Sequence, residues 1–266
     1  MTARGWTRAD VAAVLREPTA SDDKYSRGVV GVRTGSAAYP GAAVLGVEAA
    51  WRTGVGMVRY VGDTRAEDLV LARRPETVPA AGRVQAWVIG SGTDAASRSA
   101  EETAALGALL AGDIPVVVDA GALDLAPAAS APLIVTPHGR EHARLRESLG
   151  LAPDDADAVA ETAAALGGVV VRKGATTLVA DPSGEVIALD APTSWLATAG
   201  TGDVLAGIIG ALAAAGGAPL AAIAASGVWI HGKAAGAAVA AASGGPVTAL
   251  DVAEHVPVVI GAVLRG

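Results

Sequence analysis

The chain has 266 residues, of which 52% are hydrophobic and 18% charged, enough apolar material for a large core and too little charge for intrinsic disorder. A net charge of −7 and an aromatic share of 3% argue against a nucleic-acid binder, which offers positive charge or stacking surfaces. The absence of cysteine excludes disulfides, zinc–thiolate sites and a cysteine nucleophile, and it fits a cytoplasmic protein.

Short runs rich in valine and isoleucine alternate with segments of helical pattern after a polar lead over residues 1–23. This lead has no apolar core of a signal peptide, so no signal peptide is expected. The predicted strands are 29–33, 55–61, 84–89, 114–118, 133–135, 169–172, 176–180 and 185–189, the last two joined by a turn at 181–184. The predicted helices are 42–52, 64–73, 96–110, 138–149 and 156–166, and three more follow residue 200, the last at 252–264.

Strands that alternate with helices indicate a mostly parallel sheet with helices on both faces. No linker divides the chain. We therefore predict a three-layer α/β/α fold in a single domain over residues 1–266. Between Asp203 and His231 no residue is charged, as in a membrane span, but residues 216–219 (Gly-Gly-Ala-Pro) interrupt the stretch, and alanine and glycine dominate it. Two buried core helices explain it better, and we expect no membrane partner.

Polar residues and glycines directly follow several predicted strands. They are residues 90–92, Asp119, residues 136–138, Lys173 with Gly174, and the loop before residue 201. In open α/β sheets, ligands bind outside the carboxyl ends of the strands. These segments are therefore predicted to share one ligand-binding edge.

A glycine-rich helix start at residues 196–210 is the strongest local signal for a site. The small residues Ala199, Gly200, Thr201 and Gly202 lead into an apolar helix, and its open amides and dipole favour an anion, so these four residues are a predicted anion hole. Asp203 follows, where the dipole is expected to keep it ionised as a proton acceptor. The alternative is an ordinary helix start with Thr201 or Asp203 as the cap.

Several weaker signals leave alternatives open. Residues 88–95 match the G-x-G-x-x-A fingerprint of dinucleotide binding, but two strand–helix units precede them, which disfavours a dehydrogenase. Lys173 is either a surface lysine or a cation for a nucleotide phosphate. His138 is either an ordinary helix-start residue or a hydrogen-bond donor to a ligand. His142 and His231 lack a second ligand at metal spacing, so no zinc site is predicted.

Taken together, these segments resemble the ADP/ATP-dependent NAD(P)H-hydrate dehydratases of the ribokinase-like superfamily. The similarity extends from Lys24 to the C-terminus. The motifs that carry it are Lys24-Tyr-Ser-Arg-Gly28, Tyr39-Pro-Gly-Ala42, Arg52-Thr-Gly-Val-Gly56, Gly90-Ser-Gly92, Val118-Asp-Ala120, Thr136-Pro-His138, Arg172-Lys-Gly174 and Thr198-Ala-Gly-Thr-Gly-Asp-Val-Leu-Ala-Gly207.

The resemblance implies a ribokinase-like fold and a repair reaction, in which NADH or NADPH hydrated at C6 of the nicotinamide ring is dehydrated at the expense of ADP or ATP. It implies that Asp203 is the catalytic base and that Ala42, Gly92, His138 and Asp203 bind the hydrate. It further implies that the adenine nucleotide is bound by Lys173, Gly174, Ala175, Thr176, Thr177 and Gly202. Magnesium is the implied cofactor, and a homotetramer is the implied assembly.

The sequence departs from the family pattern in three places. Gly-Pro-Gly is replaced by Gly90-Ser91-Gly92, Asp-Ala-Asp ends in Gly121, and Gly139-Arg140 replace Pro-Gly after His138. The second departure removes a carboxylate that could bind magnesium. The chain has no room for the epimerase domain fused to some relatives, so we expect it to act on the S-epimer alone and to need a separate epimerase. A ribokinase-like kinase for a vitamin precursor such as hydroxyethylthiazole is the main alternative, and a nucleotide-binding regulator without turnover is another.

Overall fold

The computed structural model describes residues 3–153 and 158–266. Eight strands of these residues form one continuous sheet in the order β2-β1-β3-β4-β5-β6-β7-β8. The strands from β2 to β6 are parallel, whereas β7 is antiparallel to β6 and β8 is antiparallel to β7, which confirms the mostly parallel sheet. The strands are β1 (Val29–Arg33), β2 (Met57–Tyr60), β3 (Ala86–Ile89), β4 (Val116–Val118), β5 (Leu133–Val135), β6 (Val169–Arg172), β7 (Thr176–Ala180) and β8 (Val186–Asp190).

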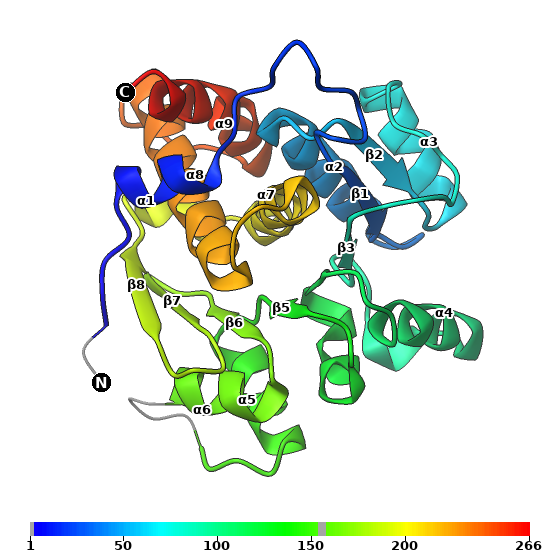
Figure 1. The fold of residues 1–266 in the computed structure, drawn as a ribbon. Coiled ribbons are helices and arrows are strands. Elements are labelled where there is room, and N and C mark those ends of the chain that lie inside the picture. Colours follow the sequence, from blue (N-terminus) through cyan, green and yellow to red (C-terminus); the bar gives the residue numbers. More distant parts are fainter. Residues whose placement is uncertain (1–2, 154–157) are drawn as a thin grey trace.

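Helices cover both faces of the sheet, as predicted for three layers (Figure 1). One layer contains α2 (Gly41–Thr53), α3 (Thr64–Arg73), α7 (Thr201–Ala215), α8 (Leu220–Ala241) and α9 (Ala249–Leu264). The other contains α4 (Ala100–Leu110), the 3₁₀ helix η2 (Ala120–Ala128), α5 (Gly139–Ser148) and α6 (Ala158–Leu166). Alternate strand residues supply the two cores, since Val117 packs in the first layer and its neighbours Val116 and Val118 in the second.

Helix α7 lies unusually close to both α2 and the sheet. A Cβ atom added to Gly207 would lie 2.2 Å from the carbonyl oxygen of Gly46 on α2, and one added to Gly210 would lie 2.1 Å from a methyl group of Val88 on β3. Glycines therefore allow the close approach that brings the start of α7 to the edge of the sheet. The uncharged stretch indeed forms two helices, α7 and α8, separated at residues 216–219. No helix in the described ranges has an apolar stretch long enough to cross a membrane.

Several expected boundaries were wrong for local reasons. The predicted helix 96–110 is divided into a 3₁₀ turn, η1 (Ala95–Ser97), and α4, because the Ser99 hydroxyl accepts a hydrogen bond from the Glu102 amide (3.0 Å) and starts a new helix. The first two residues of the predicted helix 156–166 lie outside the described residues. The polar lead contains a further helix, α1 (Arg8–Val14), whose cap Thr7 and third residue Asp10 form a reciprocal capping box. Before this helix, Arg4 pairs with Ile187 of β8.

Candidate active site

The buried carboxylate of Asp119, directly after β4, contacts residues from several segments of the predicted ligand-binding edge. Its side chain accepts hydrogen bonds from the hydroxyl groups of Ser91 and Thr136 (2.8 Å each). It also forms an ion pair with Lys173, whose Nζ atom donates to it (2.7 Å). These partners follow β3, β5 and β6, so the ends of four strands meet here. The expectation that these segments share one edge is confirmed.

The ammonium group of Lys173 lies beside the start of α7. A Cβ atom added to Gly202 would be 3.3 Å from this Nζ atom. Burial alone would lower the pKa of Lys173, but Asp119, with smaller effects of Glu141 and Asp203, raises it above the ordinary value. Lys173 therefore remains a cation, held by Asp119 next to the positive end of a helix.

The first turn of α7 has no side-chain cap. Its N-cap residue is Gly200, whose φ of +89° favours glycine, and within the described part of the chain this helix has no side-chain cap hydrogen bond. The hydroxyl of Thr201 instead donates to the carbonyls of Leu196 and Thr198 (2.9 Å each). The alternative in which Thr201 or Asp203 caps the helix is therefore wrong, and the helix start remains suited to an anion.

Burial changes the expected charge of Asp203. Burial raises the pKa of this carboxyl group to about 7; the nearby charge of Asp119 adds to the rise, and Lys173 opposes it. We expected the helix dipole to keep Asp203 fully ionised at neutral pH. The structure instead indicates a group that is about half protonated there and that can both take up and release a proton near pH 7.

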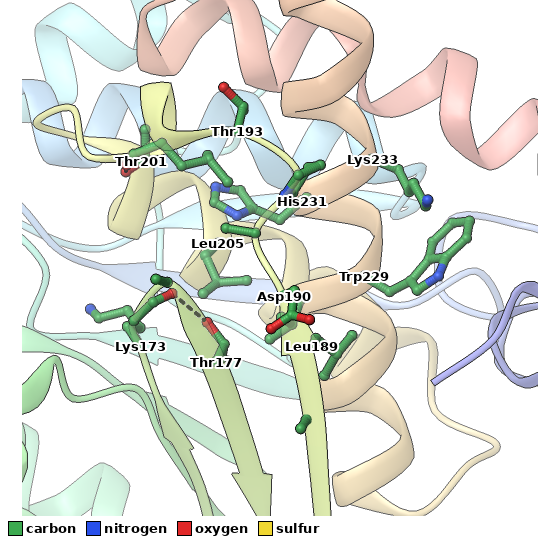
Figure 2. A pocket seen from close by; sticks show the side chains of 18 of the residues that line it. Lys173, Thr177, Leu189, Asp190, Thr193, Thr201, Leu205, Trp229, His231 and Lys233 are labelled. Carbon is green, nitrogen blue, oxygen red and sulfur yellow. Dashed lines mark hydrogen bonds between the residues drawn. The ribbon is translucent and has the colours of Figure 1, made fainter. Parts of the chain in front are cut away.

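A large cavity of 690 Å³ opens on one side of the α7 start. At one end it is lined by Lys173, Thr177 and the first turn of α7, and Figure 2 places Trp229 and Lys233 of α8 at the other end. Gly202 also faces this cavity. Its length and its cationic, amide-rich end suit a ligand with an anionic group at one extremity.

A small cavity of 410 Å³ opens on the other side of the same helix start. Its lining includes Ala42, Gly92, Ala199, Gly200 and Asp203. The Ala42 and Gly92 positions are in direct contact, because a Cβ atom on Gly92 would lie 2.4 Å from that of Ala42. Gly202 and Asp203, neighbours in the chain, thus face different cavities.

All the predicted site residues except Thr176 line one of these cavities, but His138 lines a different one from that expected. His138 lies on the large cavity rather than with Ala42 and Gly92, and its Nδ1 atom caps α5 by accepting from the amides of Arg140 (3.1 Å) and Glu141 (3.3 Å). Thr176 is not among the lining residues, since its hydroxyl donates to Asp190 (2.6 Å). Gly174 and Ala175 lie on the large cavity, as expected of residues that bind the nucleotide.

Other lining residues were missed in the sequence. Trp6 of the polar lead lines the large cavity and donates through Nε1 to Ser226 of α8 (3.1 Å). His231, Trp229 and Lys233 line it from α8. The only local signal for the α8 residues was the appearance of a histidine and a lysine in a long apolar segment.

The described residues contain no group of three or more His, Asp or Glu side chains that could hold a metal ion. Both carboxylate oxygens of Asp119 already accept hydrogen bonds. Mg²⁺ commonly binds through one or two carboxylates, waters and substrate phosphates rather than in an all-protein cage. The site therefore fits a magnesium ion carried by a nucleotide, and Asp203 in the first turn of α7 is a carboxylate that could contribute to holding it.

The geometry agrees with the comparison with known families. Residues 30–257 match the sequence profile described as NAD(P)H-hydrate dehydratase. The chain belongs to the NAD(P)H-hydrate dehydratase family. Within this family, the bifunctional NAD(P)H-hydrate repair enzyme of Mycobacterium leprae is 45% identical over 256 residues, 91% of this chain and 52% of that protein. The ADP-dependent (S)-NAD(P)H-hydrate dehydratase of Neisseria meningitidis serogroup B is 36% identical over 242 residues, 84% of this chain and 81% of that protein.

A solved structure of an NAD(P)H-hydrate dehydratase has the same architecture. The ADP/ATP-dependent enzyme of Bacillus subtilis, co-crystallised with ATP/Mg²⁺, superimposes with a TM-score of 0.87 at 28% identity, over 99% of both chains. The ribokinase-like fold is therefore confirmed. The chain spans about half the length of the mycobacterial relatives that it matches.

Proposed function

We propose that this member of the family dehydrates the S-epimer of NAD(P)H hydrate to NAD(P)H while ADP is converted to AMP and phosphate. The proposal rests on one observation: the start of α7 lies between two cavities. Gly202 lines the large cavity, and its neighbour Asp203 lines the small one. A phosphate and a hydroxyl group can thereby approach each other across a single helix end.

The nucleotide is assigned to the large cavity. Lys173 supplies a cation at the amide-rich end of α7, where the terminal phosphate of ADP is expected. The loop after β6, with Gly174, Ala175 and Thr177, lines the same cavity. The name of the Neisseria relative supports ADP as the nucleotide, and that of the Bacillus enzyme supports both ADP and ATP.

The hydrated nicotinamide ring is assigned to the small cavity, against Ala42 and Gly92 and next to Asp203. The ring hydroxyl attacks the terminal phosphorus of ADP, its proton passes to the carboxylate of Asp203, and AMP leaves. The phosphorylated ring then expels phosphate, and loss of a proton from the ring restores the double bond of NAD(P)H. An ionised carboxylate and a fixed cation are the groups that such a phosphoryl transfer needs.

Magnesium, if bound with the nucleotide, would neutralise charge on the phosphates. We assign Asp203, in the first turn of α7, as the carboxylate that would help to hold it. The support is that the Bacillus enzyme was co-crystallised with ATP/Mg²⁺.

A homotetramer, a cytoplasmic location and dependence on a separate epimerase complete the proposal. The bifunctional names of the mycobacterial relatives support a link between the dehydratase reaction and a second repair activity. Light scattering on the purified chain tests the tetramer, and its activity on separated R- and S-epimers of the hydrate tests the need for an epimerase.

Incubation of hydrated NADH with ADP or with ATP tests the function itself. We expect the near-ultraviolet absorbance of the dihydronicotinamide to recover and phosphate to be released in equal amount. Asp203→Asn, which keeps the size of the side chain, should lower kcat by about 10²–10⁴-fold, the usual contribution of a general base. Wild-type turnover in this variant would refute the mechanism.

The same assay distinguishes the alternatives. A ribokinase-like kinase would accumulate a stable phosphorylated product without free phosphate. A nucleotide-binding regulator would bind ADP and release neither product.

A further inference from the structure

Tyr39, in the loop between β1 and α2, is a large side chain that the fold leaves in water and that the proposed mechanism does not use. The residue is 65% exposed, the highest value among the exposed large hydrophobic residues of the described chain. It lines the small cavity together with Asp203. An exposed aromatic ring favours a ligand that covers it, because apolar surface of both partners then leaves water. The ring of Tyr39 is therefore available to a ligand of the small cavity.

Hydrogen bonds hold the backbone of Tyr39 against the loop after β3. Its amide donates to the carbonyl and hydroxyl oxygens of Ser36 (3.1 Å each). The Ser36 hydroxyl in turn donates to the carbonyl of Gly92 (2.9 Å). A Cβ atom added to Gly92 would lie 2.9 Å from the Tyr39 carbonyl oxygen, so the two loops are in direct contact. The side chain of Tyr39 therefore starts from a fixed backbone next to Gly92, where the hydrated ring is assigned.

The other residues around the small cavity offer little surface on which a ring could pack. Of the ten lining residues, seven are glycine, alanine or proline, and the others are Tyr39, Leu45 and Asp203. Leu45 packs against the core and lies 2.5 Å from a Cβ atom added to Gly200. Among the lining residues that the structure describes, Tyr39 thus has the only aromatic side chain. It is the group that can fix the orientation of a ring beside Asp203.

The chemistry assigned to the small cavity needs a cover against water. When the phosphorylated ring expels phosphate, the C6–O bond breaks with its electron pair on the phosphate, and the lone pair of the ring nitrogen forms a double bond to C6. The cation that results gives NAD(P)H when C5 loses a proton. If water adds to C6 and loses a proton instead, the hydrate is regenerated and a nucleotide is consumed without repair. Exclusion of water from an active site prevents such side reactions of reactive intermediates.

We propose that Tyr39 packs its ring against the hydrated nicotinamide ring and keeps water from C6 until C5 has lost its proton. The inference rests on the proposed function, since it assumes that the small cavity binds the hydrate. It adds an aromatic binding residue that determines how many nucleotides are consumed for each NAD(P)H formed.

Steady-state kinetics of the 266-residue chain with NADH hydrate and ADP test the proposal. Tyr39→Ala removes the ring, and Tyr39→Phe keeps the ring but removes the hydroxyl group. Neither change removes core packing, because Tyr39 is exposed, and an unchanged Tm checks folding. Tyr25→Ala is the matched control, since Tyr25 is also an exposed tyrosine and lines neither cavity. Each assay measures both KM values and the ratio of phosphate released to NADH formed, after subtraction of ADP hydrolysis without hydrate.

We expect Tyr39→Ala to raise the KM for the hydrate about tenfold, as for the loss of one aromatic contact, and to leave the KM for ADP unchanged. This variant should also release more phosphate than it forms NADH. Hydrate recovered from its assay in heavy-oxygen water should carry the label at C6. Tyr39→Phe and Tyr25→Ala should behave as wild type, with phosphate and NADH formed in equal amounts and no label in the hydrate.

Four results would each overturn the inference. The first is a wild-type KM for the hydrate in Tyr39→Ala, and the second is a raised KM with phosphate and NADH still equal, which shows that water is excluded without the ring. The third is an equal rise in the KM for ADP, which indicates a displaced α7. The fourth is a Tyr39→Phe protein as impaired as Tyr39→Ala, which indicates a contact of the hydroxyl group. If wild-type protein formed no NADH from the hydrate, the proposed function itself would be refuted.

Discussion

Asp203 is the residue whose protonation should govern the rate. Its raised pKa of about 7 belongs to the folded, ligand-free protein, and only the ionised form can accept the proton of the ring hydroxyl. As the pH falls below 7, kcat/KM should therefore fall, approaching tenfold for each pH unit. Above about pH 8 the rate should level off. Initial rates of absorbance recovery between pH 5 and 9 measure the profile, and a rate independent of pH below 7 would contradict the assignment.

Asp119 should be the most sensitive residue for stability at the site. It is 2% exposed and is the ion-pair partner of Lys173, so Asp119→Ala leaves the ammonium group of Lys173, whose side chain is 21% exposed, without its counter-ion. The free energy of unfolding should fall, by less than the about 3–5 kcal/mol of a fully buried pair because the ammonium group can be partly hydrated. Urea unfolding measures this change. Glu185→Ala is the matched control, because it breaks an ion pair with Arg4 in which both side chains are about half exposed, and it should cost under about 1 kcal/mol.

The sequence was sufficient to predict those site residues whose position follows from a local motif or from the end of a strand. Gly202, Asp203 and Lys173 lie where strand ends and a helix start must meet. The charge of Asp203 could not be predicted, because it depends on burial between segments distant in sequence. His231 and Trp6 were missed for the same reason, since neither belongs to a strand end or a glycine-rich loop.

At the scale of elements, the contact between α2 and α7 sets the position of the helix start. Gly207→Ala would place a methyl group 2.2 Å from the Gly46 carbonyl, so the helices must move apart. We expect a loss of about 1–3 kcal/mol in unfolding free energy, together with reduced activity, because the movement also displaces Asp203 from Ala42. Thermal unfolding and the dehydratase assay check both effects.

The control for this substitution is Gly107→Ala on the exposed side of α4, where no atom lies within 4 Å of the added methyl group. Alanine is the better helix former, so stability should rise by about 0.5–1 kcal/mol with activity unchanged. A similar loss in both variants would mean that the α2–α7 contact has no special role.

Strands and the longer helices were predictable because their patterns are local. Strands β1, β5, β6 and β7 and helix α3 have the predicted bounds. Helix α1 was missed because its short, charged sequence has a single buried apolar residue, Val11, and the interruption before α4 depends on the side-chain cap of Ser99.

At the scale of the whole molecule, the large cavity joins distant parts of the chain. Its lining extends from Gly5 in the lead to Lys233 in α8. A nucleotide that binds only the folded state at about 100 times its Kd contributes about 2.7 kcal/mol. We therefore expect ADP to raise Tm by about 5–10 °C for a chain of this size. The single-domain prediction requires one cooperative transition with and without ADP, and differential scanning calorimetry would refute it by showing two.

The consecutive placement of Gly202 and Asp203 on opposite cavities has a stereochemical consequence. Acceptor and donor would be bound at the same time, on either side of one helix end, and the proposed mechanism uses Asp203 as a base rather than as a carrier of the phosphoryl group. Transfer should then occur in a single in-line displacement from a ternary complex. A chiral, isotopically labelled terminal phosphate in the nucleotide should emerge with inverted configuration, and plots of initial rate against the two substrates should intersect rather than run parallel.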